Sequence, residues 1–171
     1  MQMLNRYFTP FALILIISAV YFRIDDFRDT GSHAPWIAAG ILVADVLINW
    51  WLGRNQYRWI KWSRQLRLIQ VWLPYVWAVP LFYLLYPYWG PMWLLFVMAP
   101  TAAALTTSRG HTVLCALVSI ATMIGIYWSR QPLSGEFLGV ALSQAAFILI
   151  FALFVNSLAQ TALRMRDAGA S

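Results

Sequence analysis

The stretch RNQYRWIKWSRQLR, residues 54–67, lies between two long apolar runs, and the rest of the chain is arranged around it. It holds five of the twelve Lys and Arg residues: Arg54, Arg58, Lys61, Arg64 and Arg67. At helical spacing, one stripe of this segment is aromatic and apolar: Trp59, Trp62, Leu66 and Ile69. Most of the cations fall on the opposite side, so the pattern predicts an amphipathic helix over residues 54–67.

A basic helix with paired tryptophans is typical of the membrane surface, where indole rings sit among headgroups and cations meet anionic phosphates. An ordinary cytoplasmic loop with scattered charge is the alternative. Either way we expect the segment on the cytoplasmic side, because short loops rich in Lys and Arg are retained there. Nucleic-acid binding is not expected, since no soluble domain accompanies the patch. We interpret these residues as a membrane-surface anchor: Arg54, Arg58, Trp59, Lys61, Trp62, Arg64 and Arg67.

The composition indicates an integral membrane protein. Hydrophobic residues make up 61% of the 171 and charged residues only 11%, with a mean hydropathy of +0.65. That is too little polar surface to cover a soluble globule of this size. The single cysteine excludes an internal disulfide, and with two histidines the chain offers no metal cluster, so we expect neither metal nor cofactor.

The apolar runs divide the chain into six expected transmembrane helices, since a bilayer core of about 30 Å needs about 20 apolar residues. Their ranges are 8–22, 36–52, 68–86, 92–107, 111–128 and 137–163. A polar loop over 23–35 and an aromatic turn over 87–91 separate some of them. The fold class expected is a single all-α membrane bundle of residues 1–171.

The distribution of cations sets the expected orientation. With both termini cytoplasmic, nine of the twelve Lys and Arg residues fall inside, and the outer side keeps Arg23, Arg28 and Arg130. A version with five helices would split the basic loops between the two sides. We therefore expect a multi-pass protein of the bacterial inner membrane with cytoplasmic termini.

Asp45 is the one acid inside an apolar span, and burying its charge at the bilayer centre costs on the order of 3 kcal/mol. Asn49 follows one helical turn later, so the two would form a polar spot for a proton, a cation or a ligand. A protonated Asp45 that hydrogen-bonds to a neighbouring helix for structural reasons is the alternative.

The third expected span, LIQVWLPYVWAVPLFYLLYP, combines Pro74 and Pro80 with several aromatic residues. A proline removes a backbone hydrogen bond, which membranes tolerate where neighbours or a cavity satisfy the freed carbonyl. The segment is a candidate wall for a hydrophobic small ligand, formed by Trp72, Tyr75, Trp77 and Tyr83. Packing together with an interfacial aromatic belt is the alternative.

His111 and Cys115 are one helical turn apart, and an imidazole beside a thiol generates a thiolate nucleophile. With Arg109 and Gly110 they resemble the membrane-embedded cysteine endopeptidases that process quorum-sensing peptides. Those enzymes, however, have a longer His-to-Cys spacing and a second glycine before the His. No complete catalytic site is apparent, so we do not expect an enzyme.

The last expected span carries a polar seam of Ser143, Gln144, Asn156, Ser157 and Gln160. Such residues in apolar helices are expected to form hydrogen bonds between helices or between chains.

The middle and end of the chain have a characteristic layout. It consists of the basic segment, the run LRLIQVWLPYVWAVPLFYLLYP, the stretch VMAPTAAALTTSRGHTVLCALVS and the exit FALFVNSLAQTALRMRDA. It resembles the N-terminal membrane sensor regions of bacterial diguanylate cyclases and sensor histidine kinases. The resemblance implies a last helix that leads into a cytoplasmic output domain. The sequence holds no GGDEF-type loop or phosphoacceptor His block, so we expect an isolated input module or a fragment of a longer receptor.

Two functions are therefore expected from the sequence. The first is a sensory input module that passes a signal through residues 137–166 to a cytoplasmic output domain or partner, as part of a homo-oligomer. The second is a small-molecule-binding subunit of a membrane transporter, because substrate-binding components of vitamin importers have a similar length and six helices. The first expected helix lacks the alanine pairs that those subunits usually present to their partner.

Overall fold

The computed structural model describes the backbone of residues 2–29, 31, 33–55, 63–130 and 135–168. It describes the side chains of residues 10–29, 31, 33–48, 50, 51, 54, 72–130 and 135–165. All the regular elements in these ranges are helices, which confirms the expected all-α class. The chain divides into two compact units, Met1–Leu95 and Phe96–Ser171.

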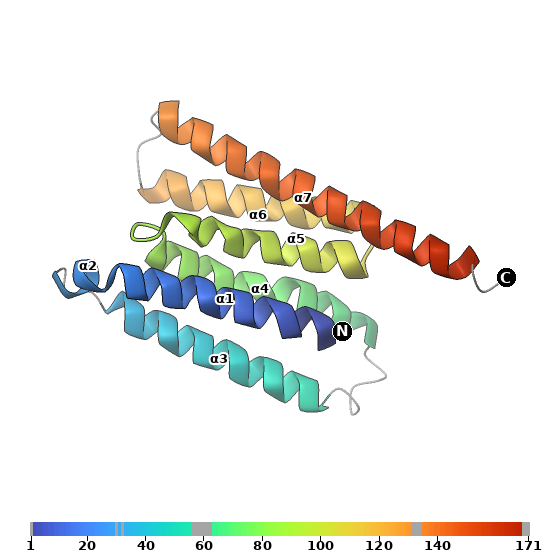
Figure 1. Cartoon of the computed structure of the whole chain (residues 1–171), viewed down its shortest axis with the longest axis horizontal. Helices are drawn as coiled ribbons and strands as arrows, with labels where there is room; N and C mark the ends of the chain where they lie inside the picture. Colours follow the sequence, from blue (N-terminus) through green and yellow to red (C-terminus); the bar gives the residue numbers. More distant parts are fainter. Residues whose placement is uncertain (1, 30, 32, 56–62, 131–134, 169–171) are drawn as a thin grey trace. The chain divides into compact units, whose positions relative to one another are not determined.

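The first unit contains α1 (Gln2–Phe22), α2 (Ile24–Asp29), α3 (Ala34–Asn55), α4 (Ser63–Leu85) and the 3-10 helix η2 (Gly90–Leu94). Helix α3 packs against both α1 and α4, and η2 packs against α1 and α4 (Figure 1). Small and apolar side chains fill the interior of this unit, among them Ala19, Ala38 and Ala78. Alanines at such contacts let helix backbones approach closely.

The second unit contains α5 (Leu95–Thr106), α6 (Arg109–Arg130) and α7 (Gly135–Ala168), with α6 packed along α7. Helix α5 includes Pro100, and three threonines donate hydroxyl hydrogen bonds to the carbonyl four residues earlier. These are Thr101 to Val97, Thr106 to Ala102 and Thr107 to Ala103, each at 2.7 Å. Such back-bonding keeps hydroxyl groups satisfied within apolar helices.

Two of the described helices are long and apolar enough to cross a bilayer, α6 over Arg109–Arg130 and α7 over Gly135–Met165. Four shorter apolar helical segments cover Pro10–Phe22, Ala34–Ile48, Trp72–Leu85 and Gly90–Thr106. Each of the six expected spans therefore corresponds to an apolar helical segment. Two of them reach the length of a membrane span.

Two segments differ from the expected ones in kind, and the other helices differ only in their ends. Residues 24–29 form helix α2, where a polar loop was expected, and residues 90–94 form η2 ahead of α5, where one continuous helix was expected from residue 92. Helix α2 was not expected because its acidic residues gave the segment the composition of a polar loop. In η2, Pro91 lies in the first turn, where a proline is tolerated. The other helices extend one to six residues beyond one or both of the expected ends.

The ends of the basic segment belong to neighbouring helices. Arg54 and Asn55 are the last residues of α3, and Ser63 to Arg67 form the beginning of α4. Residues 56–62 lie outside the described residues. The two ends of the expected amphipathic helix over 54–67 are therefore parts of α3 and α4. For residues 56–62 this helix stays a prediction.

Candidate functional site

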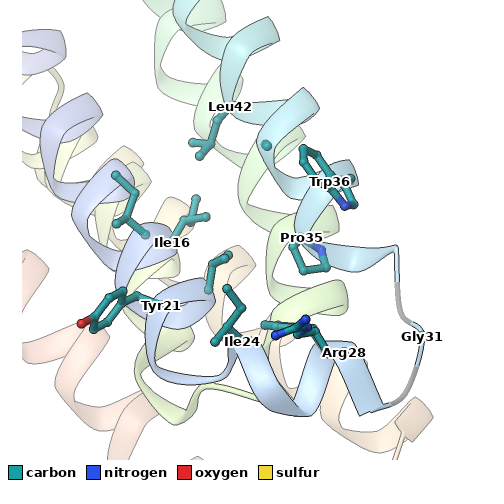
Figure 2. A pocket seen from close by; sticks show the side chains of 12 residues that line it. Ile16, Tyr21, Ile24, Arg28, Gly31, Pro35, Trp36 and Leu42 are labelled. Atoms are coloured by element: carbon teal, nitrogen blue, oxygen red, sulfur yellow. The ribbon is translucent and has the colours of Figure 1, made fainter.

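A cavity of about 780 Å³ lies between α1, α2 and α3 in the first unit (Figure 2). Its lining is mainly aliphatic and aromatic: Ile16, Ile17, Val20, Tyr21, Ile24, Phe27, Arg28, Gly31, Pro35, Trp36, Ala39 and Leu42. Volumes of 300–1,000 Å³ with a few polar groups among apolar walls are typical of small-molecule sites. This cavity is the candidate functional site.

Helix α2 positions the polar end of this cavity, because its two faces differ in composition. Ile24, Phe27 and Arg28 line the cavity. Their spacing of three and four residues puts them on one side of a helix. The three acids, Asp25, Asp26 and Asp29, fall on the other side at the same spacing.

Gly31 sets the direction in which the chain leaves α2. Its φ of +58° is in the left-handed region, and its backbone N–H donates to the carbonyl of Arg28 at 3.1 Å. Glycine is the residue that adopts this conformation without steric cost at the end of a helix. The reversal brings Pro35 of α3 next to Arg28, and Trp36 lines the cavity further from Arg28 (Figure 2).

Two aromatic pairs hold this end of the unit together. The rings of Phe27 and Tyr88 lie 4.3 Å apart, and those of Phe22 and Trp89 stack at 5.5 Å with an interplanar angle of 3°. Phe27 is only 4% exposed. The expected aromatic turn before η2 thus packs against α1 and α2.

One arginine precedes α2 and one lies in its last turn, and the two differ in their partners. The guanidinium of Arg23 forms an ion pair with Asp26 at 3.0 Å, with both side chains about half exposed. Arg28 has no ion pair within the described part of the chain, and it lies at the α2 end of the cavity, below Pro35 (Figure 2). The cavity lining therefore contains one guanidinium available to an anionic group.

The polar spot expected from Asp45 and Asn49 can be located at Asp45. Asp45 lies on α3, is half-buried and interacts with a neighbouring group. The side chain of Asn49 lies outside the described residues. Asp45 is not among the described residues that line the cavity between α1, α2 and α3.

The four expected ligand-wall aromatics all lie on α4, where Trp72, Tyr75 and Tyr83 fall within about 80° of one another and Trp77 lies on another side. Trp72 contacts Tyr75 at 5.3 Å, and Tyr75 is buried. Trp77 is about 140° around the helix from Trp72 at 3.6 residues per turn. Its indole Nε1 is buried and has no hydrogen-bond acceptor within the described residues. Tyr83 is 44% exposed. Trp72 and Tyr75 thus form a ring pair on one side of α4.

Of the seven residues expected to anchor the chain at the membrane surface, the structure describes the side chain of Arg54. The guanidinium of Arg54 lies 5.5 Å from the ring centre of Trp50, one turn earlier on α3, within the range of a cation–π contact. The side chains of the other six anchor residues, Arg58, Trp59, Lys61, Trp62, Arg64 and Arg67, lie outside the described ones. Their role at the membrane surface stays a prediction.

The pair of His111 and Cys115 lies on α6. His111 is exposed, and its Nδ1 is 3.0 Å from the hydroxyl of Ser108 just before the helix. Cys115 is 3% exposed and faces the interior of the second unit. Reactive cysteines occupy partially exposed, electropositive surroundings, which this position does not offer.

The polar seam of the last helix makes the interhelical hydrogen bonds that its composition predicts. Asn156 donates to the carbonyl of Ala104 on α5, and Tyr127 of α6 donates to Gln144 at 2.9 Å. Ser143 instead donates to Val140 within its own helix at 2.8 Å. The buried members of the seam thus join α5, α6 and α7.

Sequence reasoning missed the cavity because it treated residues 23–35 as a polar loop. The signal that points to α2 is the spacing of Ile24, Phe27 and Arg28 inside an otherwise acidic segment. The layout resemblance to sensor regions, in turn, rests on hydrophobic patterning and loop charges. Comparison of the chain with protein-family models, with curated proteins and with solved structures finds no match.

Proposed function

We propose that this chain is a six-helix sensory module of the bacterial inner membrane, which transmits a signal through α7 to a cytoplasmic output domain or partner protein. Both termini are cytoplasmic in this proposal, and the α1–α2–α3 cavity opens at the outer side. The resemblance to sensor regions of diguanylate cyclases and histidine kinases, stated above on sequence layout, agrees with it.

The observation that carries the proposal is the length of α7. Its 34 residues correspond to about 51 Å at 1.5 Å per residue, whereas a bilayer core is about 30 Å thick. Glu136 lies in its first turn and Arg164 near its end. A span that begins at the outer surface therefore reaches about 20 Å past the hydrocarbon core on the inner side, through the headgroup layer, with Arg164 near its end. Such a continuous rod transmits rotation or displacement between membrane and cytoplasm.

The exposed surface supports the membrane assignment. Large apolar side chains protrude along α7 and α1, including Ile150 at 66% and Ile14 at 65% exposure. In the apolar stretch of α7, within Gly135–Met165, only 22% is buried inside the structure. A core helix of a soluble protein would be mostly buried, whereas lipid solvates such a surface at no cost.

The six-span topology is tested by fusions of the full chain to alkaline phosphatase or to green fluorescent protein. The phosphatase is active only outside the cytoplasm, and the fluorescent protein folds only inside. We expect phosphatase activity for junctions after Asp29, Tyr88 and Arg130, and fluorescence after Arg54, Ser108 and Ala168. Fluorescence after Tyr88, or phosphatase activity after Arg54, would contradict six spans.

The signalling role is tested by joining the chain after Ala168 to a diguanylate cyclase domain and inserting one to four alanines at the junction. If α7 acts as a continuous rod, cyclase output should rise and fall with a period of 3.6 residues, because each insertion rotates the output domain by about 100°. Output that declines steadily with insertion length would indicate a simple tether and would overturn the proposal. Equal abundance of the variants in membranes is the control.

The volume of the cavity favours a second candidate function, a small-molecule-binding subunit of a transporter. At about 780 Å³ it is large enough for a transported molecule. Co-purification of the chain with an ATPase complex from native membranes would support this function over the sensor.

A further inference from the structure

We infer that the cavity between α1, α2 and α3 binds an amphiphile with one alkyl chain and one anionic headgroup, and that Arg28 recognises the headgroup. The alkyl chain lies along α1 and α3, and the carboxylate or phosphate faces α2. The signalling meaning of this ligand rests on the proposed sensory function, whereas its binding does not.

The shape of the cavity fits a chain better than a compact polar molecule. Its wall runs along α3 from Pro35 to Leu42, seven residues and about 10 Å, and along α1 past Ile16 (Figure 2). Among the described lining residues between Arg28 and Leu42, the side chains are aliphatic or aromatic, and their polar groups are the phenol of Tyr21 and the indole N–H of Trp36. Each buried CH₂ of a ligand contributes about 0.8 kcal/mol in such surroundings.

The charge is confined to one end, which determines the orientation of the ligand. Arg28 and Leu42 lie at opposite ends of the cavity in Figure 2. A guanidinium presents several donors in a fixed fork that matches a carboxylate or a phosphate. Arg28 is exposed, so water and salt screen part of its contact with an anion, and the charge contributes a preference of a few fold rather than tight binding.

The three acids of α2 do not oppose such a ligand. Asp25, Asp26 and Asp29 are on the helix side that does not line the cavity, and Asp26 is paired with Arg23. At about 100° per residue, Asp26 and Asp29 lie well around the helix from Arg28, whereas Asp25 is about 60° away and exposed, where solvent screens its charge.

The aromatic residues at the rim suit a ligand that enters from the membrane surface. Tyr21 and Trp36 line the cavity and are 73% and 79% exposed. Tyrosine and tryptophan favour the boundary between lipid and water, where one part of the ring system is apolar and the other is wet. The headgroup of an amphiphile lies at the same depth.

Binding is measured on the full chain in nanodiscs of zwitterionic lipid, with decanoate and decan-1-ol that each carry a diazirine. The two probes share the chain and differ in the charge of the headgroup. We expect crosslinks on α1 and α3 lining residues, and roughly fivefold tighter binding of the ionised acid than of the alcohol. In Arg28→Gln the acid should bind only as tightly as the alcohol, and Arg28→Lys should retain part of the preference.

Two matched variants make the result specific. Arg23→Gln removes a cation from the same segment but outside the cavity, and it should keep the full preference for the acid. Ala39→Trp fills the cavity and should abolish binding of both probes, whereas Val43→Trp, one turn further along α3 and outside the lining, should not. Equal binding of acid and alcohol to the unmodified chain, or equal effects of Arg23→Gln and Arg28→Gln, would overturn the inference.

A second arm identifies the source of the anion. Nanodiscs with lysophosphatidylglycerol, which has one acyl chain and an anionic phosphate, should displace the decanoate probe if the ligand is a membrane lysophospholipid, and leave it bound if the ligand is a free lipophilic acid. If the acid preference is absent, the proposed ligand class is wrong, and the sensory role is still tested by the cyclase fusion. If the acid preference is present but cyclase output shows no period, the sensory role is wrong and the ligand class stands.

Discussion

The side-chain amide of Asn156 on α7 donates a hydrogen bond from Nδ2 to the backbone carbonyl of Ala104 on α5, at 3.0 Å. The same nitrogen lies 3.4 Å from the hydroxyl oxygen of Thr112 on α6, and that hydroxyl donates to the carbonyl of Ser108 at 3.2 Å. The last four carbonyls of a helix have no partner within it, and Ala104 is in the last turn of α5. One buried amide thus satisfies a helix end and joins three helices.

Replacing this amide should destabilise the second unit. In Asn156→Leu the carbonyl of Ala104 loses its donor, and we expect a loss of about 1–2 kcal/mol, since hydrogen bonds between membrane helices contribute up to about that amount. Thermal unfolding of the detergent-solubilised chain provides the measurement. Ser143→Ala is the control, because Ser143 is exposed and bonds only within α7. Equal midpoints for the two variants would contradict this role of Asn156.

Tyr127 contributes a ring contact and a hydrogen bond that two substitutions separate. Its hydroxyl donates to Gln144, and its ring meets Phe137 edge-on at 4.8 Å. Tyr127→Phe should cost about 0.5–1.5 kcal/mol, because the ring contact remains. Tyr127→Ala should cost about 3 kcal/mol or more, because it also leaves a cavity at a residue that is 4% exposed. A similar shift in unfolding midpoint for both would mean that the ring contributes little.

The ion pair of Arg23 and Asp26 should matter little for stability. Both side chains are about half exposed, and exposed pairs of this kind contribute less than about 1 kcal/mol. Asp26→Asn should shift the unfolding midpoint only slightly, and the shift should shrink further in high salt. A large, salt-independent loss would show that Asp26 has a buried structural role. Its outcome also decides whether Arg23→Gln is a neutral control for ligand binding.

Phe27 should be needed both for folding of the α2 region and for the volume of the cavity. Its ring is buried, contacts Tyr88 and lines the cavity. Phe27→Ala should cost about 3 kcal/mol, and Phe27→Leu clearly less, because leucine refills most of the space. The unfolding midpoints of the two variants test this order. The reverse order would mean that α2 does not depend on this contact.

Substitution of Asp45 distinguishes a sensing role of its carboxylate from a structural one. If its carboxylate takes part in sensing, Asp45→Asn should change the output of the cyclase fusion while membrane abundance stays constant. Asparagine keeps the size and hydrogen-bonding capacity and removes the charge, whose burial in a membrane is costly. Abundance that falls in parallel with output would assign Asp45 to helix packing.

Local sequence patterns determined the helices of this protein. Apolar runs of sufficient length predict helices without knowledge of their neighbours, because each helix satisfies its own backbone hydrogen bonds. The expected end of the first helix at Phe22 is the observed end of α1, and the ranges 111–128 and 137–163 lie inside α6 and α7. The seam of Gln144 and Asn156 was recognisable because amides in apolar helices need partners.

The tertiary structure decided which of these residues meet. Asn156 and Ala104 are 52 residues apart, and Tyr127 and Gln144 are 17 apart, so no periodicity within one helix pairs them. The cavity likewise depends on three helices and on the left-handed turn at Gly31, which places Arg28 at one end of an apolar wall. Spacing along a helix specifies a face, whereas only packing specifies what that face contacts. The aromatics of α4 illustrate the difference: their types suggested one wall, whereas Trp77 lies about 140° around the helix from Trp72, and Tyr75 is buried while Tyr83 is exposed.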